Sequence, residues 1–363
     1  MKVLFLTNIP SPYRVDFFNE LGKYCSLTVL FEKGFSNERD DSWKKYSFDN
    51  FNGIFLKGKS IKTDSAVCFE VINHLKNNSY DKIICTNFST ITGMLAISYM
   101  RAKKIPYFLE SDGGFAGSGR GIKEFIKKYF IKGACGYFST AKEHDKYYLT
   151  YGAKKDKLIR YPFTALKSED ILETAPTKEE KAEYKKELGI EEEKVILSVG
   201  QFIHRKGFDV LLSAAKKLPS DCGIYIVGGE PTEEYISLKE SFGLKNIHFV
   251  GFKLKEELKK YYKAADLFVL PTRMDIWGLV INEAMAAGLP VVTTNKCIAG
   301  LELVENGVNG YIAPINDPES LAEGINNTLI IPEMGHISLE KIRNYTIEEM
   351  AKRHIEIFEG EMK

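Results

Sequence analysis

The sequence predicts an α/β protein built from two doubly wound, Rossmann-like domains. Short apolar runs alternate with amphipathic segments along most of the chain, which is the pattern of parallel sheets covered by helices on both faces. The chain has 363 residues, more than one hydrophobic core usually organises. The strand-like series also starts twice, at residue 3 and again at residue 195. We therefore expect one domain over residues 1–164 and a second over residues 165–345.

The first domain is predicted to contain five strands with helices between them. The strands are the apolar runs at 3–6, 27–31, 82–85, 107–110 and 136–139. Amphipathic stretches at 15–24, 67–75 and 92–102 indicate helices. The first apolar run is interrupted by Asn8 and Pro10, so it predicts a strand and not a signal peptide.

The second domain is predicted to contain six strands. They lie at 195–199, 224–227, 247–250, 267–270, 291–294 and 310–312. A Lys/Glu-rich helix with little apolar face is expected on the surface at 177–188. Parallel sheets of this kind bind ligands beyond the carboxyl ends of their strands. We therefore expect the site in a cleft between the domains, formed by strand-end loops.

Composition excludes several classes of protein. Lys and Arg number 50 against 49 acids, so no nucleic-acid partner is expected, although residues 101–160 are locally basic. Six scattered cysteines form no C-x-x-C pair, which argues against a zinc site or a disulfide framework and indicates a reducing, cytoplasmic compartment. No apolar run approaches the roughly 18 to 20 residues that span a bilayer, so any membrane contact would be peripheral.

Two acids flank a strand-to-helix turn in the second domain. The strand at 267–270 leads into a loop with Asp275, and Gly278 allows the backbone to approach a ligand before a helix at 279–287. The free N–H groups of a helix start suit a phosphate, whereas Asp275 and Glu283 can accept hydrogen bonds from sugar hydroxyls. The alternative is an ordinary β-α turn with solvated acids.

This segment resembles a known signature. Asp275, seven further residues and Glu283, followed by Ala-Met-Ala-Ala-Gly-Leu-Pro-Val, resemble the EX7E motif of glycosyltransferase family 4, the group 1 retaining enzymes with the GT-B fold. Asp275 stands where Glu is usual. The resemblance implies that Glu283 binds the ribose, Asp275 the donor sugar, and the backbone of Gly278 and Leu279 a phosphate.

A second motif follows the strand at 195–199. The run Gly-Gln-Phe-Ile-His-Arg-Lys-Gly at 200–207 resembles the family's Gly-Arg-x-x-x-x-Lys-Gly. Lys206 matches the Lys and Gln201 replaces the Arg, so the adjacent Arg205 is a candidate for the missing charge. The resemblance implies that Lys206 and Arg205 neutralise the leaving diphosphate, with no metal or other cofactor. For Arg205, an ordinary solvated loop residue is an equal alternative.

In the first domain the candidates follow the strands at 107–110 and 3–6. Asp112 precedes a glycine-rich loop at 113–121 and is a candidate to orient or deprotonate an acceptor hydroxyl, the alternative being a turn cap with Gly113. Arg14 is a candidate phosphate or acceptor contact, and a helix-start pair with Asp16 or Glu20 is an equal alternative.

Two further features carry weaker signals. His144 and His204 are expected to be ordinary surface histidines. Residues 122–132 are expected to form a sheet-covering helix with a basic solvated side, and a helix lying on an anionic membrane is the less favoured alternative. In this segment apolar residues alternate with lysines. The apolar residues are Ile122, Phe125, Ile126, Tyr129 and Phe130, and the lysines are Lys123, Lys127, Lys128 and Lys132.

Taken together, the resemblance implies a retaining, metal-independent glycosyltransferase. It would transfer a sugar from a nucleotide sugar, UDP-linked, to a hydroxyl of a glycan or glycolipid acceptor in polysaccharide, glycolipid or other glycoconjugate biosynthesis, in the cytoplasm or at the inner face of the membrane. In the GT-B fold the helix within 346–363 would pack back on the first domain. A nucleotide-sugar epimerase, a sugar phosphorylase and a catalytically silent nucleotide-sugar-binding protein remain alternatives.

Overall fold

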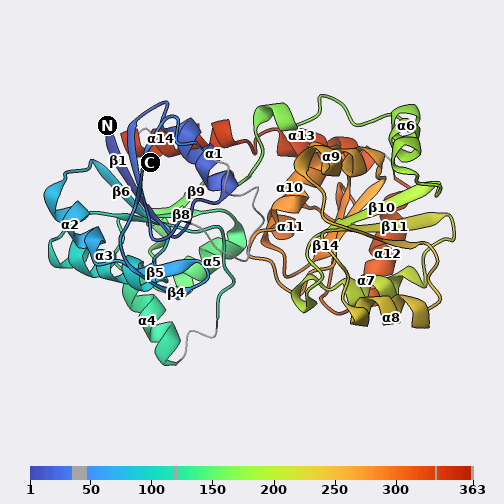
Figure 1. The fold of residues 1–363 in the computed structure, drawn as a ribbon, viewed down its shortest axis with the longest axis horizontal. Helices are drawn as coiled ribbons and strands as arrows, with labels where there is room; N and C mark the ends of the chain where they lie inside the picture. The colour runs from blue at the N-terminus through green and yellow to red at the C-terminus, as the bar shows by residue number, and fades with distance from the viewer. Residues whose placement is uncertain (35–46, 118–120, 332, 361–363) are drawn as a thin grey trace. The chain divides into compact units, whose positions relative to one another are not determined.

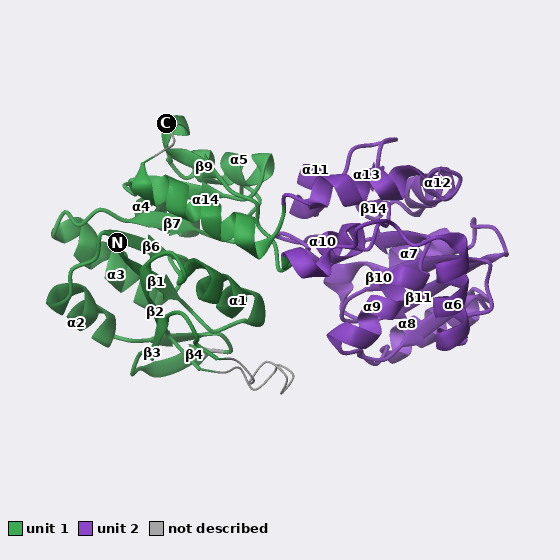
Figure 2. Cartoon of the chain, turned by 90° about the horizontal axis from the view of Figure 1, so that it is seen from above, with its two compact units in different colours: residues 1–167, 345–363 green, residues 168–344 purple. Residues whose placement is uncertain are grey.

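The computed structural model describes residues 1–34, 47–117, 121–331 and 333–360. The chain divides into two compact units, one formed by residues 1–167 and 345–363 and the other by residues 168–344 (Figure 2). The last helix, α14 (Ile347–Glu359), therefore belongs to the unit that contains the N-terminus, where it packs against α1 (Pro12–Leu21). Each unit has its own hydrophobic core.

Unit 1 contains a parallel sheet of seven strands (Figure 1). Their spatial order is β3 (Asn52–Phe55), β2 (Ser26–Phe31), β1 (Lys2–Thr7), β6 (Lys82–Cys85), β7 (Phe108–Glu110), β8 (Gly136–Ser139) and β9 (Leu158–Arg160). The five predicted strands are confirmed. The two that sequence reasoning missed, β3 and β9, lie at the sheet edges and have no fully buried residue, so neither shows a continuous apolar run.

The helices of unit 1 lie between these strands. They are α1, α2 (Glu70–Asn77), α3 (Ile91–Ala102), α4 (Ile122–Ile131) and α5 (Lys142–Thr150), together with α14. The predicted helix at 67–75 begins too early, because an antiparallel hairpin of β4 (Lys59–Lys62) and β5 (Ser65–Val67) extends to residue 67. The buried Glu32 carboxylate accepts the Ala66 N–H at 3.1 Å and thereby holds this hairpin beside the end of β2.

Helix α4 differs most from expectation. The prediction of a sheet-covering helix is wrong, because Ile122 is 81% exposed and Phe125 is 71% exposed, and only Ile131 among its residues is buried. The helix projects from the rest of unit 1 in Figure 1. Its neighbour is α3, whose Arg101 donates a hydrogen bond to the Tyr129 carbonyl.

Unit 2 contains a parallel sheet of six strands. Their order is β12 (Ile247–Val250), β11 (Cys222–Val227), β10 (Lys194–Val199), β13 (Leu267–Leu270), β14 (Val291–Thr294) and β15 (Gly310–Ala313), so all six predicted strands are confirmed. The accompanying helices are α6 (Lys178–Leu188), α7 (Phe208–Ala215), α8 (Glu233–Ser241), α9 (Lys255–Ala264), α10 (Leu279–Ala286), α11 (Ile298–Leu303), α12 (Pro318–Leu329) and α13 (Glu333–Ile342).

The strand order of unit 2 reverses between β10 and β13. From β10 the chain proceeds outward through β11 and β12, and it then returns to the other side of β10 to form β13. The loops that leave these two neighbouring strands diverge at such a switch point, where open α/β sheets bind their ligands. Both motifs singled out in the second half of the sequence lie in these two loops.

Among the residues that the structure describes, no helix is both long enough and apolar enough to cross a bilayer.

Candidate functional site

The loops after β10 and β13 are joined through the backbone of Arg205. Its carbonyl oxygen accepts the Arg273 N–H at 2.8 Å and the Thr272 hydroxyl at 2.9 Å. Gly207 closes the first loop with a φ of +70°, and a Cβ there would lie 2.1 Å from the Pro271 carbonyl oxygen. Only glycine suits this position, because the backbones of the two loops are in contact here.

The side chains of the two loops form a mixed-charge cluster. Lys206 Nζ lies 2.7 Å from an Asp275 carboxylate oxygen, and an Arg205 guanidinium nitrogen lies 3.4 Å from the same oxygen. Arg205 also donates to the Met274 carbonyl at 2.8 Å. Asp275 is therefore not the solvated acid of an ordinary turn, since its side chain is 12% exposed and paired. Two cations share one acid, which leaves a local excess of positive charge.

The start of α10 faces the same loop. Gly278 has a φ of +104°, and a Cβ there would lie 2.8 Å from the Cys297 sulfur. Glycine brings no side chain to cap the first N–H groups of the helix, which begins at Leu279. These groups are the ones that bind anions at helix starts.

Glu283 lies one turn into α10 and is half-buried. It is therefore not the solvated acid that the alternative of an ordinary β-α turn predicts. The Tyr262 hydroxyl of α9 donates to it at 2.9 Å. Burial raises the pKa of Glu283 above its ordinary value, and the Tyr262 hydrogen bond opposes that shift. Gln201 lies exposed at the start of the first loop.

Arg273 is a residue of this site that sequence reasoning missed. Its guanidinium makes two bonds to the Asp209 carboxylate, at 2.8 and 2.5 Å, and donates to the His204 carbonyl at 2.7 Å and to Asn316 at 2.7 Å. It thereby ties the loop after β13 to the loop after β10. No local pattern could have identified it, because its partners lie 43 to 69 residues away in sequence.

The candidates of unit 1 form a second cluster. The Arg14 guanidinium donates to Glu110, the last residue of β7, and to one carboxylate oxygen of Asp112, two residues further on. The Tyr13 hydroxyl donates to the other oxygen of Asp112 at 2.6 Å. Arg14 is 4% exposed. The alternative in which Arg14 pairs with Asp16 or Glu20 is wrong, because its guanidinium is occupied by one buried and one half-buried carboxylate, Glu110 and Asp112.

Glu110 is fully buried between Arg14 and His354 of α14. A ring nitrogen of His354 lies 3.1 Å from the Glu110 carboxylate. Burial alone would raise the pKa of Glu110, but Arg14 and His354 outweigh it and hold that pKa at about 2. Asp112 is the member of this cluster that reaches the surface, with 27% of its side chain exposed.

His144 is buried, so the expectation of a surface histidine is wrong. Its Nδ1 accepts the Thr140 backbone N–H at 3.2 Å, and its Nε2 lies 2.9 Å from the hydroxyl of Ser111. Ser111 is the residue between the two acids of the cluster. Burial, reinforced by Arg160, lowers the pKa of His144 to about 3, which keeps the ring neutral.

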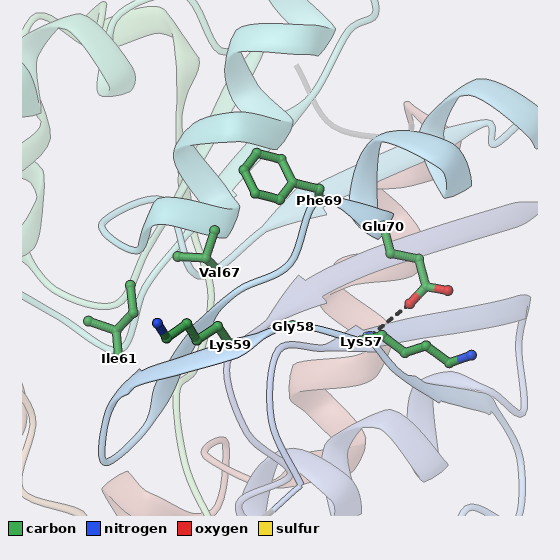
Figure 3. Close-up of a pocket in the computed structure, with 7 residues that line it drawn as sticks. All are labelled: Lys57, Gly58, Lys59, Ile61, Val67, Phe69 and Glu70. Atoms are coloured by element: carbon green, nitrogen blue, oxygen red, sulfur yellow. Dashed lines mark hydrogen bonds between the residues drawn. The ribbon is translucent and has the colours of Figure 1, made fainter.

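Two other observations bear on ligands. Within the described part of the chain, no group of three or more His, Cys, Asp or Glu side chains is placed to hold a metal ion. A cavity of about 440 Å³ lies beside the hairpin of unit 1, and no predicted site residue is among the lining residues, which Figure 3 shows. Of the glycine-rich loop at 113–121, residues 118–120 lie outside the described residues.

Comparison with known proteins places this geometry in a family. Residues 180–349 match the family model of glycosyl transferases group 1. Residues 180–349 therefore belong to the group 1 glycosyltransferase family. An uncharacterized glycosyltransferase of Methanocaldococcus jannaschii is 34% identical over 42% of this chain and 40% of its own length. The lipopolysaccharide glucosyltransferase WaaG of Escherichia coli is 29% identical over 45% of this chain and 44% of its own length.

The likeness to group 1 members therefore spans less than half the length of these curated relatives. Solved structures extend it in fold. HepE of Anabaena, in complex with UDP-glucose, is similar over 99% of this chain and 100% of its own, with a TM-score of 0.74 at 16% identity. At this identity the similarity shows the GT-B fold of two Rossmann-like units.

The burial of His144 makes the free energy of unfolding depend on pH. Because the folded-state pKa is lowered from 6.5 to about 3, the unfolded chain binds the proton more readily between these values. We expect the free energy of unfolding to fall as the pH drops below 6.5, by up to about 1.4 kcal/mol per pH unit from this group. Urea unfolding at pH 7 and pH 5 measures it.

His144→Gln should weaken this pH dependence, whereas His74→Gln, at a half-exposed histidine of the same unit, should leave it intact. An unchanged slope in His144→Gln would show that His144 is not the titrating group.

Proposed function

We propose that this protein is a retaining glycosyltransferase that transfers a sugar from a UDP-sugar to a hydroxyl of a glycan or glycolipid acceptor. The observation that carries the proposal is the pairing of Lys206 with Asp275 across two joined loops at the switch point of unit 2. Similar proteins support the substrate classes. WaaG is named a lipopolysaccharide glucosyltransferase, and HepE was solved with UDP-glucose.

The donor would lie along these loops with its diphosphate at the start of α10. Lys206 and Arg205 supply positive charge, and the N–H groups that follow Gly278, beginning with Leu279, supply hydrogen-bond donors. A carboxylate repels phosphate but accepts hydrogen bonds from hydroxyls. In the proposal Glu283 binds the ribose, Asp275 binds the donor sugar, and Gln201 donates a hydrogen bond without charge.

The chemistry then follows from where charge develops. Cleavage of the bond between sugar and phosphate builds negative charge on the leaving diphosphate, and fixed cations with oriented N–H groups stabilise it without a metal. The acceptor hydroxyl attacks the same face of an oxocarbenium-like sugar while its proton passes to the departing phosphate. Asp112 in unit 1 is assigned the acceptor side, where it accepts a hydrogen bond from that hydroxyl and orients it for attack.

The Lys206–Asp275 pair gives donor binding a specific consequence. In the free protein Lys206 is neutralised by Asp275. An arriving diphosphate competes for the ammonium group, and this frees a carboxylate oxygen of Asp275 to accept from the sugar. The two donor contacts would therefore form together.

We expect the wild-type protein to release UDP from a UDP-sugar in the presence of a lipopolysaccharide or polar-lipid acceptor extract, with retention at the anomeric carbon. Lys206→Ala should lower turnover by about 100-fold, the scale measured when one oriented charge-stabilising group is removed. Glu283→Ala should sharply lower turnover at subsaturating UDP-sugar, because it removes the acceptor of the ribose hydroxyls. Lys216→Ala, at an exposed lysine beyond α7, is the matched control. Coupled detection of UDP measures turnover, and circular dichroism checks folding.

Near-normal turnover in either site variant would contradict the assignment. Epimerised donor without acceptor would indicate an epimerase, and phosphate-dependent release of a sugar phosphate would indicate a phosphorylase. Binding of UDP-sugar without any reaction would indicate a silent binding protein.

We further propose that α4 contacts an anionic membrane, which would bring a lipid-linked acceptor within reach. Four apolar side chains of this helix are exposed, namely Ile122 at 81%, Phe125 at 71%, Tyr129 at 48% and Ile126 at 40%. Three exposed lysines lie among them, and Lys132 follows the helix. Exposed apolar residues flanked by lysines are complementary to a bilayer with acidic headgroups.

We expect the full-length protein to co-sediment with vesicles that contain phosphatidylglycerol and to bind phosphatidylcholine vesicles weakly. Phe125→Asp should reduce binding by about tenfold or more, because it replaces an exposed apolar side chain, available to insert into the bilayer, by a charge. Phe252→Asp, at a phenylalanine of unit 2 that is 58% exposed, is the matched control. Equal binding by both variants would contradict the proposal, and a concentration-dependent dimer that Phe125→Asp abolishes would assign the face to a second copy.

A further inference from the structure

We infer that His354, Glu110 and Arg14 are positioning residues that fix the orientation of Asp112. The inference rests on the proposed function in one respect, which is the placement of Asp112 on the acceptor side. A continuous series of contacts supports it, running from α14 to Asp112, which lies just beyond β7.

The chain of contacts has four members. His354 contacts one oxygen of Glu110 at 3.1 Å, and Arg14 bonds the other oxygen of Glu110. A second nitrogen of Arg14 bonds Asp112. The side chains of His354 and Glu110 are 0% exposed and that of Arg14 is 4% exposed, whereas Asp112 is 27% exposed. The network therefore opens to solvent at Asp112.

Both oxygens of Asp112 are held by consecutive residues in the first turn of α1. Arg14 bonds Oδ1, and the hydroxyl of Tyr13 donates to Oδ2 at 2.6 Å. Two bonds from a planar guanidinium and a phenol fix the plane of the carboxylate. Each oxygen keeps a lone pair that can accept a substrate hydroxyl, because an ionised carboxylate has about four acceptor sites.

The hydrogen bonds of His354 support the same series of contacts. Its Nδ1 lies 2.7 Å from the Met350 carbonyl oxygen, which can only accept, so Nδ1 carries a proton. Arg14 and His354 hold the pKa of Glu110 at about 2, so this carboxylate also only accepts. A proton on Nε2 would let the ring donate to Glu110 as well, and Arg14 donates to both carboxylates.

Stability alone does not account for this arrangement. Removing charges from water costs several kcal/mol per ion, and apolar residues of similar volume often serve a core as well or better. His354 already lies among aromatic rings and stacks on Phe138 with 4.4 Å between the ring centroids. The charged network is better explained by its effect on Asp112 at its exposed end, because a misplaced Asp112 carboxylate would lower turnover.

The inference gives α14 a specific role. His354 and Glu110 are 244 residues apart in sequence, and the contact exists only because α14 packs in unit 1. The C-terminal helix would thus set the geometry of a group on the acceptor side while leaving the donor loops of unit 2 untouched.

A double-mutant cycle tests the inference with UDP-glucose as donor. We expect His354→Leu to lower turnover about tenfold at unchanged affinity for UDP, since a shift of about 1 Å in a catalytic group can cost up to 100-fold. In the Asp112→Asn background the same replacement should have no further effect, because His354 acts only through Asp112. His354→Gln, which can still donate to Glu110, should recover part of the loss.

Arg14→Lys is the second variant, because a single ammonium cannot hold two carboxylates as the guanidinium fork does. Phe358→Leu replaces a buried α14 residue outside the network and is the packing control. Multiplicative losses in the double variant, or equal losses in Phe358→Leu and His354→Leu, would overturn the inference.

A second readout separates this inference from the proposed function. Hydrogen exchange of the backbone at residues 110–114 should increase in His354→Leu and stay unchanged in Phe358→Leu. If the wild type shows no transfer, the proposed function fails and the exchange measurement still decides the positioning. Unchanged exchange in His354→Leu would overturn it.

Discussion

The site in unit 2 depends on one constraint, the backbone contact between the loops that leave β10 and β13. The Arg205 carbonyl accepts two hydrogen bonds from the second loop, and Gly207 approaches Pro271 more closely than a side chain allows. This contact brings Lys206 within 2.7 Å of Asp275. Because the two strands flank the switch point of the sheet, the joined loops lie where an open α/β sheet binds its ligand.

The central strands could be predicted, and the candidate residues of unit 2 could be singled out, because their signals are local. Buried parallel strands are continuous apolar runs, and the motif residues Lys206, Asp275 and Glu283 each lie within a short strand-loop-helix segment. The edge strands β3 and β9 lack full burial and gave no such run. For helix α4 the sequence shows a clear amphipathic pattern, but a helix that covers a sheet and a helix with an exposed apolar face both have this pattern. Only the structure distinguishes the two.

The network of unit 1 could not be predicted from sequence. Arg14 and Glu110 are separated by 96 residues, and Glu110 and His354 by 244. The only protein partners that local reasoning offered for Arg14 were acids of its own helix, because a sequence displays only nearby acids. A buried guanidinium instead takes the partners that the fold brings to it, and here these are the acids at the carboxyl end of β7.

In the proposed function, donor binding depends on the coupling of the two loops and not on any single charge. Arg273 is the direct test, because it ties Asp209 and the His204 carbonyl to the loop of Asp275 and is not itself assigned to the donor. Calorimetric titration of UDP into Arg273→Ala should show affinity about tenfold weaker than in the wild type, at unchanged secondary structure. Wild-type affinity for UDP in this variant would contradict the account.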